Sequence, residues 1–293
     1  MRVVKEKAYA KINLYLDVLS KREDGFHDVK TVMHSVTLYD TVTVSAEPAT
    51  VTNIKMNVYG TRFLPTDGKN LASAAAQLFL ARAMKNASVH IKLEKRIPIA
   101  AGLAGGSTDA AAVLRAMNKL FGKMFSMRAL ISMASELGSD VAYCLVGKTA
   151  LCEGRGELLT PLDKAPRLNL VVAVANERVS TPAAYKALDA LYSDFDGSIS
   201  TGGDDSYAKL VASLGNVVID KDGLFNVFEA AVLPDCKGAS KIKERLIELG
   251  AYSSLMSGSG PSVYGLFESF DAAKAACSVL RAEGFRAYYA KSV

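Results

Sequence analysis

A glycine-rich segment between a predicted strand and a predicted helix constrains this chain more than any other feature. The segment PIAAGLAGGSTDAAAVLRAMNKL covers residues 98–120 and begins with small residues that include Gly102, Gly105 and Gly106. Residues 88–97 before it alternate like a strand, and the apolar residues toward its end recur at helical spacing. Small residues directly before a helix indicate that the backbone turns tightly or that another group comes very close to it.

A strand, a glycine-rich turn and a helix start, in this order, form an arrangement that binds phosphate. Glycines let backbone N–H groups point at an anion, and the helix dipole adds positive potential. Ser107 is the predicted N-cap, and the hydroxyls of Ser107 and Thr108 are available to a phosphate or its magnesium. The segment has neither the Gly-Lys-Ser/Thr of a Walker A loop nor the G-x-G of a dinucleotide site, so a tight turn remains the competing interpretation.

The chain is long enough for two domains, because it has 293 residues of which 50% are hydrophobic. The proline-bounded PLDKAP (161–166) predicts a boundary that gives domains 1–162 and 163–293. The first domain has an α/β pattern, and the second reads strand–helix–strand–strand–helix–strand, which is typical of an α+β sandwich. A polar insert occupies residues 193–206. Helices are expected at 70–85, from Ser107, at 126–137, from Thr181, near Lys209, near Gly238 and from Asp271.

Composition indicates a soluble protein of the cytoplasm. Lys and Arg number 35 against 30 Asp and Glu, without a basic run, so no nucleic-acid partner is predicted and phosphorylated ligands are compatible. The four cysteines are scattered and form no CxxC pair, which indicates reduced core residues. No long apolar span occurs, so no membrane partner is expected. We expect a monomer or a weak homodimer.

Three motifs, in the correct order, resemble those of the GHMP kinase superfamily, which includes galactokinase and the homoserine, mevalonate and phosphomevalonate kinases. PIAAGLAGGSTDAA is similar to the superfamily's second motif, AYAKINLYLDVLSKREDGFH (8–27) to its first and LMSGSGPSVYGLF (255–267) to its third. A-K-I-N-L-x-L followed by D-G-[YF]-H resembles the branch that phosphorylates cytidyl-diphospho-methylerythritol in the non-mevalonate isoprenoid pathway. LGSDVAYCLVGKTALCEGRGE (137–157) is similar to the catalytic segment of that branch.

The resemblance implies a two-domain GHMP kinase fold, with an N-terminal α/β domain like ribosomal protein S5 and a C-terminal ferredoxin-like α+β domain. It implies transfer of the γ-phosphate of ATP to the 2-hydroxyl of the cytidyl-diphospho-methylerythritol. Magnesium is implied by ATP chemistry, although the sequence shows no carboxylate cage for it. The ATP-binding residues that the resemblance implies are Pro98, Ile99, Ala100, Ala101, Gly102, Leu103, Ala104, Gly105, Gly106, Ser107 and Thr108.

The resemblance also implies two catalytic residues, Lys11 and Asp140. Strand alternation places Lys11 and Asn13 on one face, where they can reach one ligand together, although an exposed edge lysine is the plainer interpretation. The resemblance makes Lys11 a catalytic or substrate-orienting cation. Asp140 follows a glycine and is open to interpretation as an N-cap or turn residue. By resemblance it accepts the proton of the substrate hydroxyl, and a nearby lysine would keep it ionised.

A cytidine pocket is expected around the turn that carries Phe26 and His27. These residues are either ordinary hairpin residues or a base-stacking ring with a polar reader beside it. The family usually carries Tyr at this position, so Phe26 keeps the ring and loses the hydroxyl. Asn13 is expected to bind substrate, and Thr181 and Tyr185 to line the far wall of the pocket. Helix capping is an equally good explanation of Thr181.

The sequence also predicts the backbone conformation of two alanines, the approach of a second loop and the role of two histidines. Ala101 and Ala104 stand where many relatives carry glycine, so both are expected to have ordinary backbone conformations. Residues 257–260 are either a hairpin of small residues or a loop that approaches the glycine-rich segment. His34 and His90 lie in strand patterns without metal-ligating companions, and we expect them to be structural.

Two alternative functions remain open at this point. A sibling enzyme such as homoserine or mevalonate kinase would not need the DGFH turn to recognise a cytosine. A non-catalytic nucleotide-binding or RNA-binding module would have no reason to combine Lys11 with Asp140.

Overall fold

The computed structural model describes residues 2–192, 203–216 and 218–293, so most of the predicted polar insert lies outside the described residues. The chain divides into two compact units, each built from several segments. The first unit comprises Met1–Ala10, Tyr39–Ile99 and Ala104–Gly147, and the second comprises Lys11–Leu38, Ala100–Leu103 and Lys148–Val293. The units therefore do not follow a single boundary at residue 162. The physical reason is that two long strands, β1 (Arg2–Lys21) and β2 (His27–Pro48), contribute to both units.

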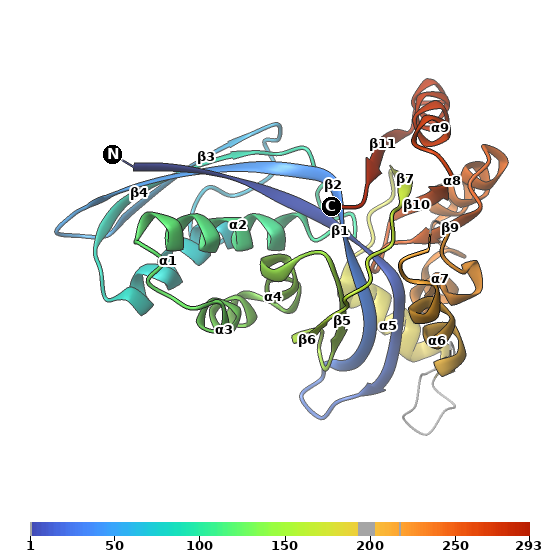
Figure 1. Ribbon diagram of the computed structural model, residues 1–293, viewed down its shortest axis with the longest axis horizontal. Coiled ribbons are helices and arrows are strands. Elements are labelled where there is room, and N and C mark those ends of the chain that lie inside the picture. The colour runs from blue at the N-terminus through green and yellow to red at the C-terminus, as the bar shows by residue number, and fades with distance from the viewer. Residues whose placement is uncertain (1, 193–202, 217) are drawn as a thin grey trace. The chain divides into compact units, whose positions relative to one another are not determined.

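The first unit is a sheet covered by helices. Strand β2 pairs antiparallel with β4 from Thr41↔Glu94 to Pro48↔Ala87, and β3 pairs parallel with β4. Figure 1 shows the helices of this unit on one side of the sheet. The elements other than β1 and β2 are β3 (Asn53–Tyr59), α1 (Leu71–Ala83), β4 (Ala87–Glu94), α2 (Gly105–Leu120), α3 (Met127–Leu137) and α4 (Ser139–Val146).

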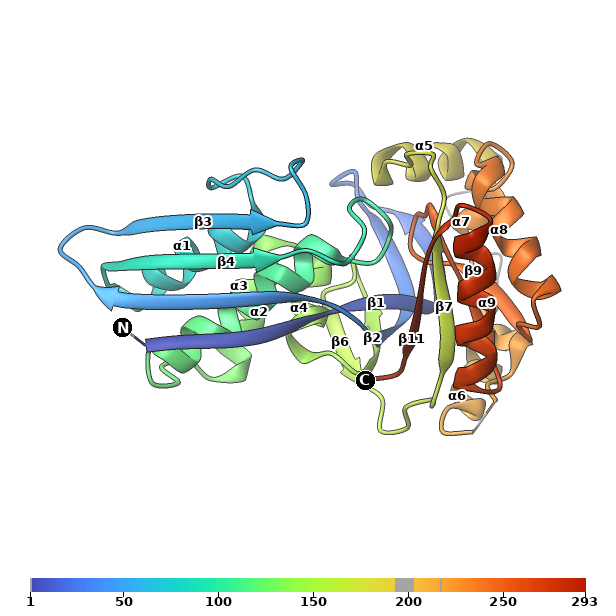
Figure 2. The same cartoon turned by 90° about the horizontal axis from the view of Figure 1, so that it is seen from above.

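The second unit contains an antiparallel sheet with strand order β11-β7-β10-β9. In chain order these strands are fourth, first, third and second, which is the order of the ferredoxin-like domain that the resemblance implies. Figure 2 shows α9 alongside β7. The elements of this sheet and its helices are β7 (Asn169–Val174), α5 (Thr181–Leu191), α6 (Gly203–Ser213), α7 (Phe228–Val232), α8 (Lys237–Glu248), β9 (Ser253–Met256), β10 (Ser262–Phe267), α9 (Phe270–Ala282) and β11 (Arg286–Lys291).

Short elements that the sequence did not predict complete the second unit. Strand β5 (Thr149–Glu153) pairs antiparallel with β2 and with β6 (Leu158–Pro161). Strand β8 (Phe225–Asn226) pairs parallel with β1 after the short helix η1 (Lys221–Gly223). Such short segments have too few residues to show a periodicity of their own.

Side-chain caps explain why most predicted helix starts are correct. The side chain of Asn70 accepts a hydrogen bond from Ala72 N at the start of α1. Serines do the same at the starts of α3, α5 and α9. Within the described residues, none of the helices combines the length and the apolar character needed to cross a membrane.

His34 and the four cysteines lie in the interior, as predicted for structural residues. All four cysteines are buried. The imidazole of His34 hydrogen-bonds through Nδ1 with Thr149 Oγ1 at 2.8 Å and through Nε2 with Ser292 Oγ at 2.9 Å. Burial lowers the pKa of His34 to about 4. His90 is exposed on β4 and hydrogen-bonds with Asn57 Oδ1 at 2.6 Å.

The burial of His34 predicts a pH-dependent stability. Its pKa is depressed in the folded state, to about 4, so below pH 6.5 the unfolded chain binds a proton that the folded chain refuses. The stability is present above pH 6.5 and is lost as the pH falls toward 4. We expect His34 to remove about 2 kcal/mol of unfolding free energy between pH 7 and pH 5. Denaturant unfolding of the wild type and of His34→Gln at both pH values measures this difference.

The matched control is His90→Gln, which removes an exposed imidazole. Its unfolding free energy should show the same pH dependence as that of the wild type. Equal pH dependence in all three proteins would contradict the role of His34.

Candidate active site

The glycine-rich segment turns through left-handed backbone conformations. Ala100 has φ 51°, Gly102 has φ 72° and Ala104 has φ 55°. Ala104 is the N-cap of α2 and makes no side-chain cap hydrogen bond. The predicted ordinary conformation is therefore correct for Ala101 and wrong for Ala104, where an L-residue in this region costs roughly 1 kcal/mol. The prediction of Ser107 as the N-cap is also wrong, because α2 begins at Gly105 and Ser107 lies in its first turn.

Gly102 has no room for a side chain, because Ser257 of the same unit lies close to its backbone. Ser257 Oγ donates a hydrogen bond to Gly102 O at 3.0 Å, and Lys11 N donates to Leu103 O at 3.2 Å. A Cβ on Gly102 would lie 2.1 Å from Ser257 O. The expected approach of residues 257–260 to the glycine-rich segment is confirmed at this contact.

Gly105 is small for a similar reason in the first unit. A Cβ there would lie 3.1 Å from Ile97 Cγ2 and 3.3 Å from Lys95 Nζ, whereas a Cβ on Gly106 would meet nothing closer than Leu71 Cδ1 at 3.8 Å. Gly106 is thus the least crowded of the three glycines. Of the predicted ATP-binding residues, the exposed ones are Ile99, Ala100 and Gly106, and the buried ones are Pro98, Ala101, Leu103 and Thr108.

A buried charged cluster lies beside Gly105, and the sequence analysis missed it. Lys95 Nζ donates to Asp109 Oδ2 at 2.7 Å and also to Asp40. Burial alone would lower the pKa of Lys95, but Asp109 and Asp40 raise it. Burial, with the charge of Asp40, raises the pKa of Asp109 well above its usual range against the opposing effect of Lys95. One lysine therefore serves two carboxyl groups.

Lys11 and Asn13 share one face of β1, as the alternation predicts. Lys11 is 4% exposed, which excludes the exposed edge lysine. Its Nζ donates to Asn13 Oδ1 at 2.8 Å, and Gly258 N donates to the same oxygen at 2.9 Å. Asn13 Nδ2 in turn donates to Thr31 Oγ1 at 2.8 Å. The amine of Lys11 is therefore held by a side chain that is itself hydrogen-bonded through both its oxygen and its nitrogen.

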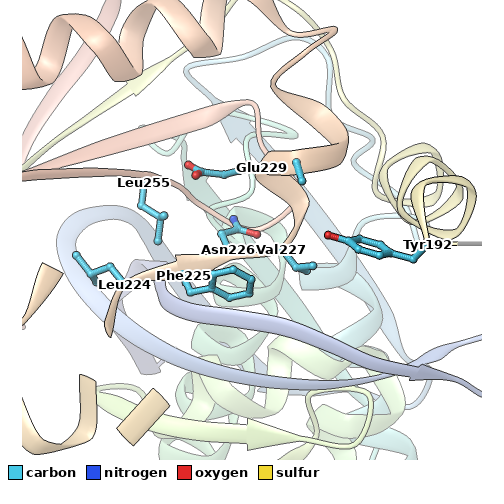
Figure 3. A pocket seen from close by; sticks show the side chains of 8 residues that line it. Tyr192, Leu224, Phe225, Asn226, Val227, Glu229 and Leu255 are labelled. Atoms are coloured by element: carbon cyan, nitrogen blue, oxygen red, sulfur yellow. The ribbon is translucent and has the colours of Figure 1, made fainter. Parts of the chain in front are cut away.

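The backbone around Gly258 is hydrogen-bonded by Asn226 and Glu229, two residues that the sequence analysis did not identify. Asn226 Nδ2 donates to Met256 O at 2.7 Å and to Gly258 O at 2.9 Å, and Met256 N donates to Glu229 Oε1 at 2.8 Å. Figure 3 shows Asn226 and Glu229 among the residues that line a cavity of about 260 Å³. These contacts fix the backbone whose N–H reaches Asn13.

Asp140 lies in the first turn of α4, after the N-cap Gly138. The alternative interpretation of Asp140 as the N-cap is therefore wrong. Its side chain is half-buried, and the positive end of the helix dipole stabilises a carboxylate at this position. Asp140 belongs to the first unit and Lys11 to the second.

The structure brings most of the predicted cytidine-pocket residues together in the second unit. Phe26 is 58% exposed, and the guanidinium of Arg155 lies 5.2 Å from its ring centroid. The ring of His27 stacks on that of Tyr185 at 4.6 Å with an interplanar angle of 21°. Thr181 is the first residue of α5, which Ser180 caps, so the capping explanation of Thr181 is wrong. Its Oγ1 lies 3.1 Å from the hydroxyl oxygen of Ser259.

Asp189 is a further residue of this cluster that the sequence analysis did not name. Its Oδ1 lies 2.7 Å from His27 Nε2, and its Oδ2 accepts a hydrogen bond from Lys21 Nζ at 2.6 Å. Burial acts to raise the pKa of Asp189, but the hydrogen bonds from Lys21 and His27 lower it below its usual value. Asp189 follows Tyr185 by one helical turn on α5, so helical spacing offered a signal for it.

The described residues can be examined for side chains that could bind the magnesium ion that ATP chemistry implies. Among them, no group of three or more His, Cys, Asp or Glu side chains is arranged to hold a metal ion. Ser107 and Thr108, whose hydroxyls were predicted to be available to magnesium, lie in the first turn of α2, where Ser107 is half-buried and Thr108 is buried.

Family comparisons match both parts of the chain. The family described as "GHMP kinases N terminal domain" matches residues 70–148, and "GHMP kinases C terminal" matches residues 221–286.

Similar proteins extend the match over nearly the whole chain. A 4-diphosphocytidyl-2-C-methyl-D-erythritol kinase of Caldicellulosiruptor saccharolyticus is 44% identical over 275 residues, 92% of this chain and 90% of that protein. A crystal structure of a 4-(cytidine 5'-diphospho)-2C-methyl-D-erythritol kinase has a TM-score of 0.80 and 32% identity, and covers 98% of both chains. A homoserine kinase of Cytophaga hutchinsonii, with a TM-score of 0.76, 21% identity and coverage of 100% and 95%, shares the fold.

The contact at Gly102 predicts an unusually costly glycine substitution. Gly102→Ala combines the left-handed backbone with a Cβ 2.1 Å from Ser257 O, so the loop at 257–260 must move. We expect a loss on the order of 3 kcal/mol in unfolding free energy. Denaturant unfolding measures this loss. Gly284→Ala is the matched control, because Gly284 has φ 89° and open space around its Cβ position.

The control should lose only about 1 kcal/mol, which is the backbone cost alone. Equal losses in the two variants would show that the approach of Ser257 does not constrain Gly102.

Proposed function

The chain belongs to the 4-diphosphocytidyl-2-C-methyl-D-erythritol kinase family of GHMP kinases, and on this premise we propose which residues carry out its reaction. The enzyme phosphorylates 4-diphosphocytidyl-2-C-methyl-D-erythritol with ATP in the non-mevalonate pathway of isoprenoid synthesis. The observation that carries this conclusion is the similarity to kinases of that name over nearly the entire chain. We propose the 2-hydroxyl as the phosphate acceptor.

Lys11 is the proposed cation at the reaction centre. Its ammonium carries three donors, and Asn13 accepts one of them at 2.8 Å. Phosphoryl transfer passes through a loose transition state, so positioning and charge neutralisation contribute more than strong base character. A lysine that is held in place before the substrate binds meets this requirement, because its rotamer entropy is already lost.

Asp140 is the proposed acceptor of the substrate proton. As the bond between the 2-oxygen and the γ-phosphorus forms, the bond from that phosphorus to the bridging oxygen breaks, and ADP leaves. The hydroxyl proton passes to the carboxylate of Asp140. Asp140 lies in the first turn of α4, at the helix end whose dipole attracts negative charge.

The segment 98–108 is the proposed ATP site, and its open part is the start of α2. Gly106 is exposed and has room for a Cβ without a close contact, and Ser107 is a half-buried residue of the first helical turn. These features suit an anion, because first-turn N–H groups have no partner inside the helix. Magnesium bound to ATP would add charge neutralisation, and Ser107 is its proposed protein ligand; the donor set fits a metal that the phosphates carry.

Phe26, His27, Tyr185, Thr181 and Asn13 are the proposed acceptor-binding residues. The support for this proposal is the cluster of exposed ring, buried imidazole and stacked tyrosine in one unit. The exposed face of Phe26 suits a nucleobase, since base–aromatic stacking tolerates any base and leaves discrimination to polar neighbours.

The test of the function is ADP release from ATP with three acceptors supplied separately. The cytidyl-diphospho-methylerythritol should support turnover, whereas homoserine and mevalonate should not. Turnover with either of the other acceptors at a comparable kcat/KM would overturn the substrate assignment.

Asp140→Asn tests the proton acceptor. We expect kcat to fall at least about 100-fold, because a general base is lost, while ATP binding is largely retained. The matched control is Asp271→Asn, since Asp271 occupies the equivalent first-turn position in α9. It should keep its activity, although it loses the same helix-dipole interaction. Steady-state kinetics and ATP titration measure the two effects, and a residual rate above about a tenth of the wild-type rate contradicts the assignment.

Phe26→Ala tests the base-stacking role. We expect acceptor binding to weaken by roughly 1–3 kcal/mol, with KM for ATP nearly constant and some loss of kcat. Phe63→Ala is the control, because Phe63 is an exposed ring of the first unit, outside the turn. Acceptor and ATP kinetics of both variants give the comparison.

An acceptor without its cytidyl group should lose the same contact. The losses from Phe26→Ala and from the truncated acceptor should therefore not add fully. Fully additive losses would place the cytosine elsewhere.

A further inference from the structure

The imidazole of His27 is held by its neighbours in one orientation. Tyr185 covers one face of the ring, and Asp189 Oδ1 lies 2.7 Å from Nε2. An ionised carboxylate accepts hydrogen bonds and has none to donate, so Nε2 is the nitrogen that carries the hydrogen. Lys21 pairs with the second oxygen of this carboxylate at 2.6 Å. In a neutral imidazole with its hydrogen on Nε2, the lone pair lies on Nδ1.

The second ring nitrogen of His27 is available to a ligand. Within the described part of the chain, Nδ1 has no hydrogen-bond partner, and it is not among the side-chain atoms that are both sealed from solvent and unpartnered. The adjacent residue, Phe26, presents an exposed ring. Two neighbouring residues thus offer a stacking surface and a hydrogen-bond acceptor.

We propose that Asp189 is a specificity-determining residue, which fixes the tautomer of His27 so that Nδ1 accepts a hydrogen bond from the amino group of cytosine and rejects uracil. This inference rests on the proposed function of the turn as the nucleobase site. Asp189 acts through His27 and is therefore a positioning residue.

The two pyrimidines differ at the position that an acceptor would read. Cytosine carries an amino donor where uracil carries a carbonyl acceptor, and the two rings have nearly the same shape. Stacking on Phe26 cannot separate them. An acceptor at Nδ1 pairs with the amino group, whereas it faces the uracil oxygen with two lone pairs opposed and no hydrogen between them.

The contact with Lys21 makes Asp189→Asn an informative substitution. An amide at this position has one oxygen and one nitrogen to distribute between Lys21 and His27. Lys21 can only donate, so it draws the amide oxygen toward itself and leaves the NH₂ group facing Nε2. The hydrogen of the imidazole then moves to Nδ1, and the group that faces the base changes from acceptor to donor.

The experiment compares kcat/KM for the cytidyl acceptor and for its uridyl analogue, prepared chemically. The wild type should prefer the cytidyl compound. In Asp189→Asn this preference should fall by about tenfold to a hundredfold, partly through a gain with the uridyl compound. The double variant Lys21→Met with Asp189→Asn should recover part of the preference, because the amide is then free to turn its oxygen to Nε2.

Asp28→Asn is the matched control. Asp28 lies next to His27 in sequence but pairs with Arg22 at 2.8 Å, so its removal should leave the preference unchanged. A substitution that only destabilised the turn would lower turnover with both acceptors together and would not improve the uridyl compound.

Nitrogen NMR of the His27 imidazole gives a readout that does not depend on turnover. The wild type should carry its hydrogen on Nε2 near neutral pH, and Asp189→Asn should carry it on Nδ1. Hydrogen on Nδ1 in the wild type, or an unchanged cytidyl preference in Asp189→Asn, overturns the inference. A wild type that fails to phosphorylate the cytidyl acceptor, with the expected tautomer present, instead counts against the proposed function.

Discussion

The second unit's part of the candidate active site depends on one side chain, the amide of Asn13. Its oxygen accepts hydrogen bonds from Lys11 Nζ and from Gly258 N, and its nitrogen donates to Thr31 Oγ1. The hydroxyl of Thr31 already donates to Tyr15 O, so it needs a donor from Asn13. Asparagine provides acceptor and donor in one planar group, which aspartate at neutral pH does not. Segments distant in sequence are thereby joined at a position that is 1% exposed, where each lost hydrogen bond is costly.

The glycine-rich segment is small for reasons that the sequence pattern describes only in part. The pattern indicates a tight turn or a close approach, and the structure shows both. The groups that approach Gly102 and Gly105 belong to the protein itself, namely Ser257 O and the side chains of Ile97 and Lys95. Gly106, in the first turn of α2, is the least crowded of the three glycines. This distinction matters because a substitution at Gly102 or Gly105 disturbs packing before it disturbs any ligand.

Local patterns predicted what depends on neighbours in sequence. Strand alternation predicted the shared face of Lys11 and Asn13, and helix patterns predicted most helices and their caps. The N-cap of α2 was predicted wrongly, because the loop before it is bound through Gly102 to another segment and the helix starts where that loop ends. Residues whose role depends on which distant segments meet could not be predicted, and these are Asp40, Lys95, Asp109, Asn226 and Glu229. Asp189 is intermediate, since its spacing from Tyr185 was visible but its contact with His27 was not.

The proposed chemistry and the proposed base recognition share one physical design. In each, the residue that meets the substrate is held by a second residue, Lys11 by Asn13 and His27 by Asp189. A free lysine has roughly 2 kcal/mol of rotamer entropy to lose, and a free histidine can present either nitrogen. When folding removes these freedoms, binding and reaction do not have to do so. Because Lys11 and His27 are 4% and 7% exposed, water does not compete strongly for their bonds to the supporting residues. Whether the supporting residue donates or accepts a hydrogen bond then determines whether the residue that it supports presents a donor or an acceptor to the substrate.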